Sequence, residues 1–375
     1  MTGPPPPWDP PQPLTAAAVE ARLSEPAVAL TMMIRGAARS GPGADARLLG
    51  LLARYRGAGA PVEVRAGYRL AALEPPTQGW EVALGSPTMH LLAAYAATLR
   101  DNDGQEVLPA VRSRQAERLA RDGRAGVVTT TGGQTAIIDS AGVLLSKSSR
   151  TVFAETKPEQ LRQRLDALAG RRGFGDALDA PIVAYLAEAL ENVREHAVDV
   201  DARGLCLLQM KRINLDQVPA IERQLPEAGA FRRYVAGVKA SRPGLDGFLE
   251  LTVGDSGPGI AASLSGDDSV YARSISVERE VLLRAFNPTV SRKVTPGKGG
   301  GLTTMLENLH RRDGAAQVRT GRLSLFRTSV TPTGDRVEWS LVDGPGRTPD
   351  PRLWTIAELA HTSGTAITML VPIDR

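Results

Sequence analysis

The sequence predicts an α/β protein in two domains, the smaller of which comes first. Three observations support this prediction. The chain has 375 residues, which is enough for two domains and a sizeable core. Its first part alternates strand-like and helix-like runs. In the middle, residues 181–197 have an apolar stripe on one helix face, which suits packing on a sheet, and apolar strand-like runs follow.

The N-terminal part begins with a proline-rich segment, residues 1–14, which we expect to be disordered. Residues 15–150 then form the smaller α/β domain, because glycine and proline breaks separate strand-like and helix-like runs. Asp45 and the Ser-Pro pair at 86–87 are helix start signals. The expected elements are a strand at 28–34, a helix at 44–55, an extended piece from 62, helices at 86–99 and 111–120, and hairpins over 127–145.

The C-terminal domain, residues 155–375, is expected to open with a helix at 156–169 that leads into the central helix. Residues 212–246 are polar and interrupted by prolines, so we interpret them as an insertion with a short helix. The other expected elements are strands at 205–210, 248–253, 323–329, 336–342 and 366–371, helices at 280–286 and 302–311, and a glycine- and lysine-rich loop at 291–301.

Composition excludes several classes of protein. No uncharged apolar run approaches the roughly 18 residues that a membrane helix needs, and the N-terminus does not resemble a signal peptide, so we expect a cytoplasmic protein without a membrane partner. The single cysteine, Cys206, lies in an apolar run and excludes an internal disulfide or a cysteine-based zinc cluster. A net charge of +4 gives no clear nucleic-acid signal.

The central helix carries Glu188, Asn192 and His196 four residues apart, and therefore on one helix face. The Asn192 side-chain oxygen is a suitable ligand for Mg²⁺, which prefers oxygen. Glu188, one turn earlier, is placed to orient or deprotonate a water molecule or a hydroxyl group. Taken alone, the same face is explained as well by exposure to solvent, and His196 has no assigned role.

A second motif, Asp-Ser-Gly-Pro-Gly at 255–259, follows an apolar strand directly. A carboxylate at a strand end can accept a hydrogen bond from a buried amino group such as the exocyclic amine of adenine. Gly257 and Gly259 allow the backbone to approach a flat ring because they lack a Cβ atom. The alternative interpretation of this motif alone is a simple Asp-Ser-Gly turn.

A third motif is Gly-Lys-Gly-Gly-Gly-Leu at 297–302, which opens a helix. Glycines at a helix N-terminus suit phosphate binding through free N–H groups, and Lys298 adds a charge. The motif is not a Walker A loop, because no Ser or Thr follows the lysine directly. A flexible surface loop is the alternative. A fourth and weaker signal is Gly364-Thr365, which opens the last strand and offers a hydroxyl group to a base.

In this order the four motifs resemble those of the GHKL ATPases, over about residues 155–375. The resemblance implies a Bergerat fold: an α+β sandwich with a mixed sheet under helices, and a mobile lid at about 261–301 over ATP. It implies that Asn192 binds magnesium, that Asp255 and Thr365 bind adenine, and that Glu188 matches the water-activating acid. The residues implied to bind ATP are Asn192, Asp255, Gly257, Gly259, Lys298, Gly299, Gly300, Gly301, Leu302 and Thr365.

The predicted function is ATP and Mg²⁺ binding, with hydrolysis coupled to a protein partner, a homodimer or a signal read by residues 15–150. Two alternatives stay open. One is a protein kinase of the anti-sigma or histidine-kinase type, for which His90 is the only upstream phosphoacceptor candidate, although strand-like sequence follows where a second dimerisation helix should end. The other is a non-catalytic module whose lid is ordered by nucleotide. His310 and His361 are expected to be structural.

Overall fold

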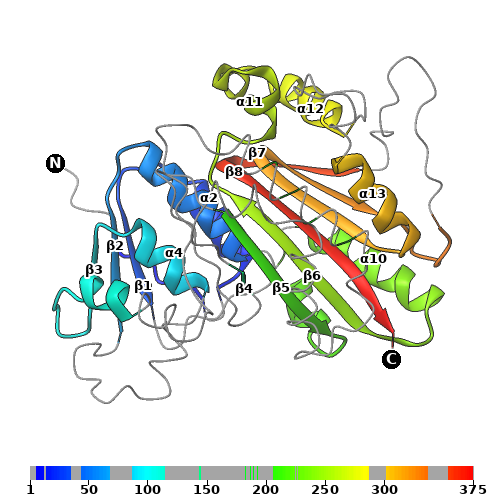
Figure 1. Cartoon of the computed structure of the whole chain (residues 1–375), viewed down its shortest axis with the longest axis horizontal. Coiled ribbons are helices and arrows are strands. Elements are labelled where there is room, and N and C mark those ends of the chain that lie inside the picture. Colours follow the sequence, from blue (N-terminus) through cyan, green and yellow to red (C-terminus); the bar gives the residue numbers. More distant parts are fainter. Residues whose placement is uncertain are drawn as a thin grey trace, which may run out of the picture.

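The computed structural model contains two sheets with helices packed against them (Figure 1). The α/β class and the order of a smaller α/β unit before a larger sheet are therefore confirmed. The structure describes residues 6–11, 14–34, 44–67, 87–114, 143–144, 206–223, 225, 227–286, 301–336 and 354–374, together with positions 182, 186, 189 and 192 of the central helix.

The N-terminal unit has a parallel sheet in the order β1-β2-β3. Parallel neighbours need a crossover connection, and helices supply it here. The strands are β1 (Leu30–Ile34), β2 (Val62–Ala66) and β3 (Thr98–Arg100), and the helices are α1 (Ala16–Leu23), α2 (Ala44–Gly57) and α4 (Pro87–Tyr95). The expected strand at 28–34, the helix at 44–55 and the extended piece from 62 are confirmed within a few residues.

Three details of this unit differ from expectation. The helix expected at 86–99 ends at Tyr95, because residues 98–100 pair with β2 and this tertiary pairing overrides the helical pattern. Trp8, in the segment expected to be disordered, exchanges backbone hydrogen bonds with Thr31 (2.7 Å) and Met33 (2.8 Å) of β1. The helix expected at 111–120 is helical over 108–114, and its remainder lies outside the described residues.

The second sheet has five strands in the order β4-β5-β6-β8-β7. A mixed sheet was expected, but every described pairing in it is antiparallel. Part of the expected 127–145 hairpins, β4, pairs with β5 and so belongs to this sheet, while most of that segment and the strand at 336–342 lie outside the described residues. The strands are β4 (Val143–Leu144), β5 (Cys206–Asn214), β6 (Leu245–Asp255), β7 (Ala315–Thr328) and β8 (Thr355–Asp374).

The segment at 212–246 is not a polar insertion with one short helix. It contains α9 (Val218–Glu222) and the 14-residue α10 (Ala228–Ser241). Pro219 occupies the first turn of α9, where a missing N–H is harmless, so it marks a helix start and not a break. Phe231 and Tyr234 of α10 are buried in a cluster with Phe248 of β6.

The described part of the expected lid, residues 261–286, is helical. It contains α11 (Ile260–Ser265), a 3₁₀-helix, η3 (Asp268–Ala272), and α12 (Ile275–Arg284), and it lies beside the end of the sheet where β6 ends (Figure 1). Glu278 of α12 is fully buried and accepts hydrogen bonds from Arg322 N and Nε, both at 2.7 Å. This contact ties α12 to β7. The helix α13 (Gly301–Arg311) follows, close to the expected 302–311.

The two units share one hydrophobic core. Helix α2 packs across β6 and β8, and one cluster of buried side chains has members from both units. The contact is close enough to require glycine: a methyl group on Gly50 would overlap Thr362 Oγ1 and lie 2.9 Å from the Ser363 carbonyl oxygen. The second unit is therefore built directly on the first.

We expect the substitution Gly50→Ala to lower the free energy of unfolding by about 1–3 kcal/mol, because the methyl group overpacks the α2–β8 contact. Gly57→Ala, in the same helix, is the matched control: a Cβ atom there meets nothing within 4 Å, so it should be neutral or stabilise by up to about 1 kcal/mol. Urea unfolding of both variants tests this. Equal stabilisation by the two substitutions would contradict the docking of α2.

Candidate functional site

The candidate site is centred on Asp255, the last residue of β6. Its Oδ1 atom accepts hydrogen bonds from the backbone N–H groups of Gly257 (2.9 Å) and Thr365 (3.3 Å). Asp255 is also paired with Thr365 in the β6–β8 register. Two motifs that are 110 residues apart in the chain therefore meet at one point, and the structure brings the predicted site residues Asp255, Gly257 and Thr365 together.

The environment of the Asp255 carboxyl group disfavours its charge. Burial raises its pKa to about 7, although the hydrogen bonds from Gly257 and Thr365 act in the opposite direction. Part of the residue remains accessible. Within the described ranges, hydrogen bonds reach this carboxyl group through Oδ1, so Oδ2 is available to a ligand. A ligand that donates a hydrogen bond to Oδ2 would favour the ionised form of Asp255. This hydrogen bond would replace contacts with water that the carboxyl group loses on folding.

Two glycines in the motifs are required by the backbone. Gly364 has φ = 80°, and a methyl group on it would overlap the carbonyl oxygen of Asp255. Gly259 has φ = 86° at the N-cap of α11, where a methyl group would overlap the Tyr271 hydroxyl and lie 2.8 Å from Thr320 Oγ1. Both positions favour glycine because positive φ is costly for other residues. The glycines therefore let β6, β8 and α11 converge on Asp255.

Three further residues at this site were not found from the sequence. Thr320 Oγ1 accepts from Ile260 N (3.1 Å) and donates to the Gly364 carbonyl oxygen (3.2 Å), so β7 contacts both glycine turns. The Tyr271 hydroxyl donates to the Pro258 carbonyl oxygen at 2.7 Å. No local pattern marks either side chain. The only available signal for Thr320 is its cross-strand pairing with Thr365, which a sequence does not display.

The third missed residue is Tyr95, at the end of α4 in the N-terminal unit. Burial raises the pKa of its hydroxyl group to about 12, and this group lies beside Ser256 and close to Asp255. The sequence had assigned the whole site to residues 155–375. The structure shows that the first unit also reaches the Asp-Ser-Gly-Pro-Gly turn.

The magnesium and phosphate motifs are described only in part. On the central helix Ile182, Leu186 and Ala189 are buried and Asn192 is half-buried, so Asn192 lies at the edge of the apolar stripe. Gly301 is the first residue of α13, which places the end of the glycine motif at a helix N-terminus, and Leu302 follows it. Glu188, His196, Lys298, Gly299 and Gly300 lie outside the described residues.

Two other side-chain groups bear on the chemistry. His361 packs edge-on against Tyr271, and burial with nearby arginines lowers its pKa to about 4, so it is neutral at physiological pH. This agrees with a structural role. Among the residues that the structure describes, no three His, Cys, Asp or Glu side chains gather in a way that could hold a metal ion. Asn192, the residue predicted to bind Mg²⁺, is among the described residues.

Neither family models, curated proteins nor solved structures give a match to this chain. No helix in the described part of the chain is long and apolar enough to cross a membrane.

The raised pKa of Asp255 predicts a pH-dependent stability. The pKa of Asp255 in the folded protein lies above the unfolded value of about 4, so the folded state binds this proton more tightly than the unfolded state does. The free energy of unfolding therefore falls as pH rises from about 4 to about 7, by at most about 4 kcal/mol. Asp255→Asn removes the charge but keeps an oxygen acceptor. We expect this variant to gain stability over the wild type between about pH 5 and about pH 8, measured by urea unfolding.

The matched control for this prediction is Asp216→Asn, the same change at an exposed position. Its stability difference from the wild type should not vary over this pH range. A pH-independent difference for Asp255→Asn would show that the carboxyl group is not disfavoured in the folded protein.

Proposed function

We propose that this chain binds ATP and Mg²⁺ as a member of the GHKL superfamily, with Asp255 as the acceptor for the adenine amino group. One observation carries the proposal: a desolvated carboxylate at the end of β6 is held by Thr365 N at the point where Gly259 and Gly364 bring two turns together. This combination of acid, hydroxyl and closely packed backbone is what the sequence motifs predicted for a base-binding site.

The chemistry of the described groups fits a purine with an exocyclic amine. Such an amine donates a hydrogen bond, and Asp255 Oδ2 is the matching acceptor. Because the carboxyl group is desolvated, a donor there is worth more than at an exposed acid. The Thr365 hydroxyl, 3.3 Å from Thr320 Oγ1, offers a second polar contact to the base or to a bridging water.

The phosphate end of the nucleotide is assigned to the glycine motif. The N-terminus of α13, which begins at Gly301, suits an anion because the helix dipole is positive there. Asn192 would ligate Mg²⁺ through its side-chain oxygen, with phosphate oxygens and water as the other ligands. Bound ATP supplies a phosphoanhydride bond, and Glu188 would accept a proton from the water that attacks the γ-phosphorus as the bond to ADP breaks.

We expect Asp255→Asn to weaken ATP binding by about 10- to 100-fold, which corresponds to losing a hydrogen bond to a charged group. Because the same substitution is expected to stabilise the fold near neutral pH, the loss cannot arise from unfolding. Calorimetric titration with Mg²⁺–ATP measures it, with Asp216→Asn as the control that should bind as the wild type does. Unchanged affinity in Asp255→Asn would refute the assignment of the base site.

We expect Glu188→Ala to keep ATP affinity and lose at least about 100-fold in the rate of phosphate release, since a positioned base contributes that much. Phosphate release and ATP affinity are measured on the same preparation. A full rate in this variant would contradict hydrolysis assisted by Glu188. With labelled ATP, transfer of label to a protein would identify a kinase, and binding without turnover or transfer would identify a nucleotide-gated module.

A further inference from the structure

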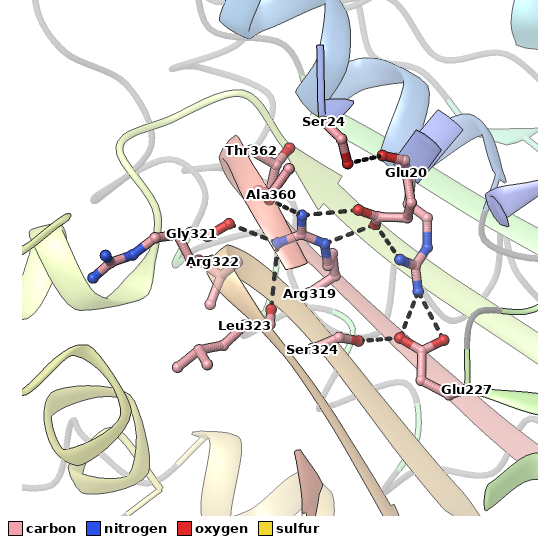
Figure 2. A network of polar contacts seen from close by, with 12 residues as sticks. Glu20, Ser24, Glu227, Arg319, Gly321, Arg322, Leu323, Ser324, Ala360 and Thr362 are labelled. Carbon is pink, nitrogen blue, oxygen red and sulfur yellow. Dashed lines mark hydrogen bonds and ion pairs between the residues drawn. The ribbon is translucent and has the colours of Figure 1, made fainter. Parts of the chain in front are cut away.

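A buried network of charges joins the N-terminal helices to the second sheet (Figure 2). Arg319 of β7 binds both carboxylate oxygens of Glu20 in α1, at 2.7 and 3.0 Å. Arg47 of α2 pairs with the same Glu20 and, at 3.2 Å, with both carboxylate oxygens of Glu227. Ser324 of β7 donates to Glu227. The network thus contains two carboxylates and two guanidinium groups, so its formal charges cancel. Each of these four residues is less than 7% exposed.

The network holds its charged form. Burial alone would raise the pKa of Glu20, but Arg47 and Arg319 outweigh burial and lower the pKa below its ordinary value. The bidentate geometry at Arg319 is the strong form of such a pair. Glu20 is therefore fixed as an anion between α1 and β7.

Arg319 also fixes the backbone next to the nucleotide site. Its Nη1 atom donates to the carbonyl oxygens of Gly321 (2.6 Å) and Leu323 (3.4 Å), where the β7–β8 register shifts. Thr320 lies between Arg319 and Gly321 in the chain, and its hydroxyl group contacts Ile260 N and the Gly364 carbonyl oxygen. The position of Thr320 is therefore set from one side by α1 and from the other by the site.

The other N-terminal helices touch the neighbours of the remaining site residues. A methyl group on Gly254, the residue before Asp255, would lie 3.2 Å from Ala46 Cβ of α2. Gly50 of α2 packs on Thr362 and Ser363, just before Gly364. Tyr95 of α4 lies beside Ser256. Each strand that carries a site residue is thus contacted by the N-terminal unit at the adjacent position.

We propose that α1, α2 and α4 form a regulatory element of the Asp255 site, with Glu20 and Arg319 as positioning residues. The proposal rests on the nucleotide function proposed above. Docking of the three helices holds Thr320, Asp255 and Gly364 in the geometry that binds nucleotide. Because linkage is reciprocal, nucleotide strengthens the docking by the same factor.

The test compares Glu20→Gln with Glu25→Gln, in calorimetric titrations with Mg²⁺–ATP. In Glu20→Gln, the amide Nε2 donors face the guanidinium donors of Arg47 and Arg319, so the docking weakens. We expect the Kd for ATP to rise about fivefold or more. Glu25 pairs with Arg22 and its side chain is 55% exposed, so the same change there should leave the Kd unchanged.

A measurement on the wild type keeps the proposal testable if Glu20→Gln does not fold. We expect Mg²⁺–ATP to slow amide hydrogen exchange in residues 16–23, which contain none of the residues proposed to bind nucleotide. If both variants bind ATP with the same Kd, the regulatory role is overturned and the nucleotide site is unaffected. The same conclusion holds if the wild type binds ATP but amide exchange in α1 does not change. If the wild type does not bind ATP, the proposed function fails, and this inference fails with it.

Discussion

The structure depends most on the buried pair between Glu20 of α1 and Arg319 of β7. The two residues are 299 positions apart, and their bidentate contact is shared with Arg47. Removing one partner of such a pair leaves an uncompensated buried charge, which typically costs about 3–5 kcal/mol. The pair therefore makes the position of α1 and the backbone of β7 near Gly321, where the register shifts, dependent on each other. It also joins two units that the sequence presents as separate.

The same constraint explains why the site is close-packed. Arg319 and Thr320 are consecutive residues of β7, so their side chains point to opposite faces of the strand. One side chain binds the N-terminal unit, and the other binds the turns at Gly259 and Gly364. These elements desolvate the Asp255 carboxyl group, and its raised pKa is a direct result.

Sequence reasoning found what local patterns encode. Helix α2, strand β2, the Asp255 turn and its neighbour Thr365 follow from apolar periodicity and from turn residues. It placed the start of β7 too late, because Gln317, Arg319 and Thr320 look like a polar loop until their buried partners are known. Tyr95 and Thr320 were missed for the same reason: their roles come from residues distant in the chain, which no local motif records.

The central claim is that Asp255 accepts a hydrogen bond from the amino group of adenine. Calorimetric titration of the wild-type protein with Mg²⁺–ATP and with Mg²⁺–inosine triphosphate tests it most directly, because inosine carries an oxygen where adenine carries the amine. We expect ATP to bind, and inosine triphosphate to bind at least about tenfold more weakly. The reason is that the carboxylate of Asp255 and the oxygen of the inosine base are both acceptors and would face each other. Equal affinity for the two nucleotides, or no affinity for ATP, would contradict it.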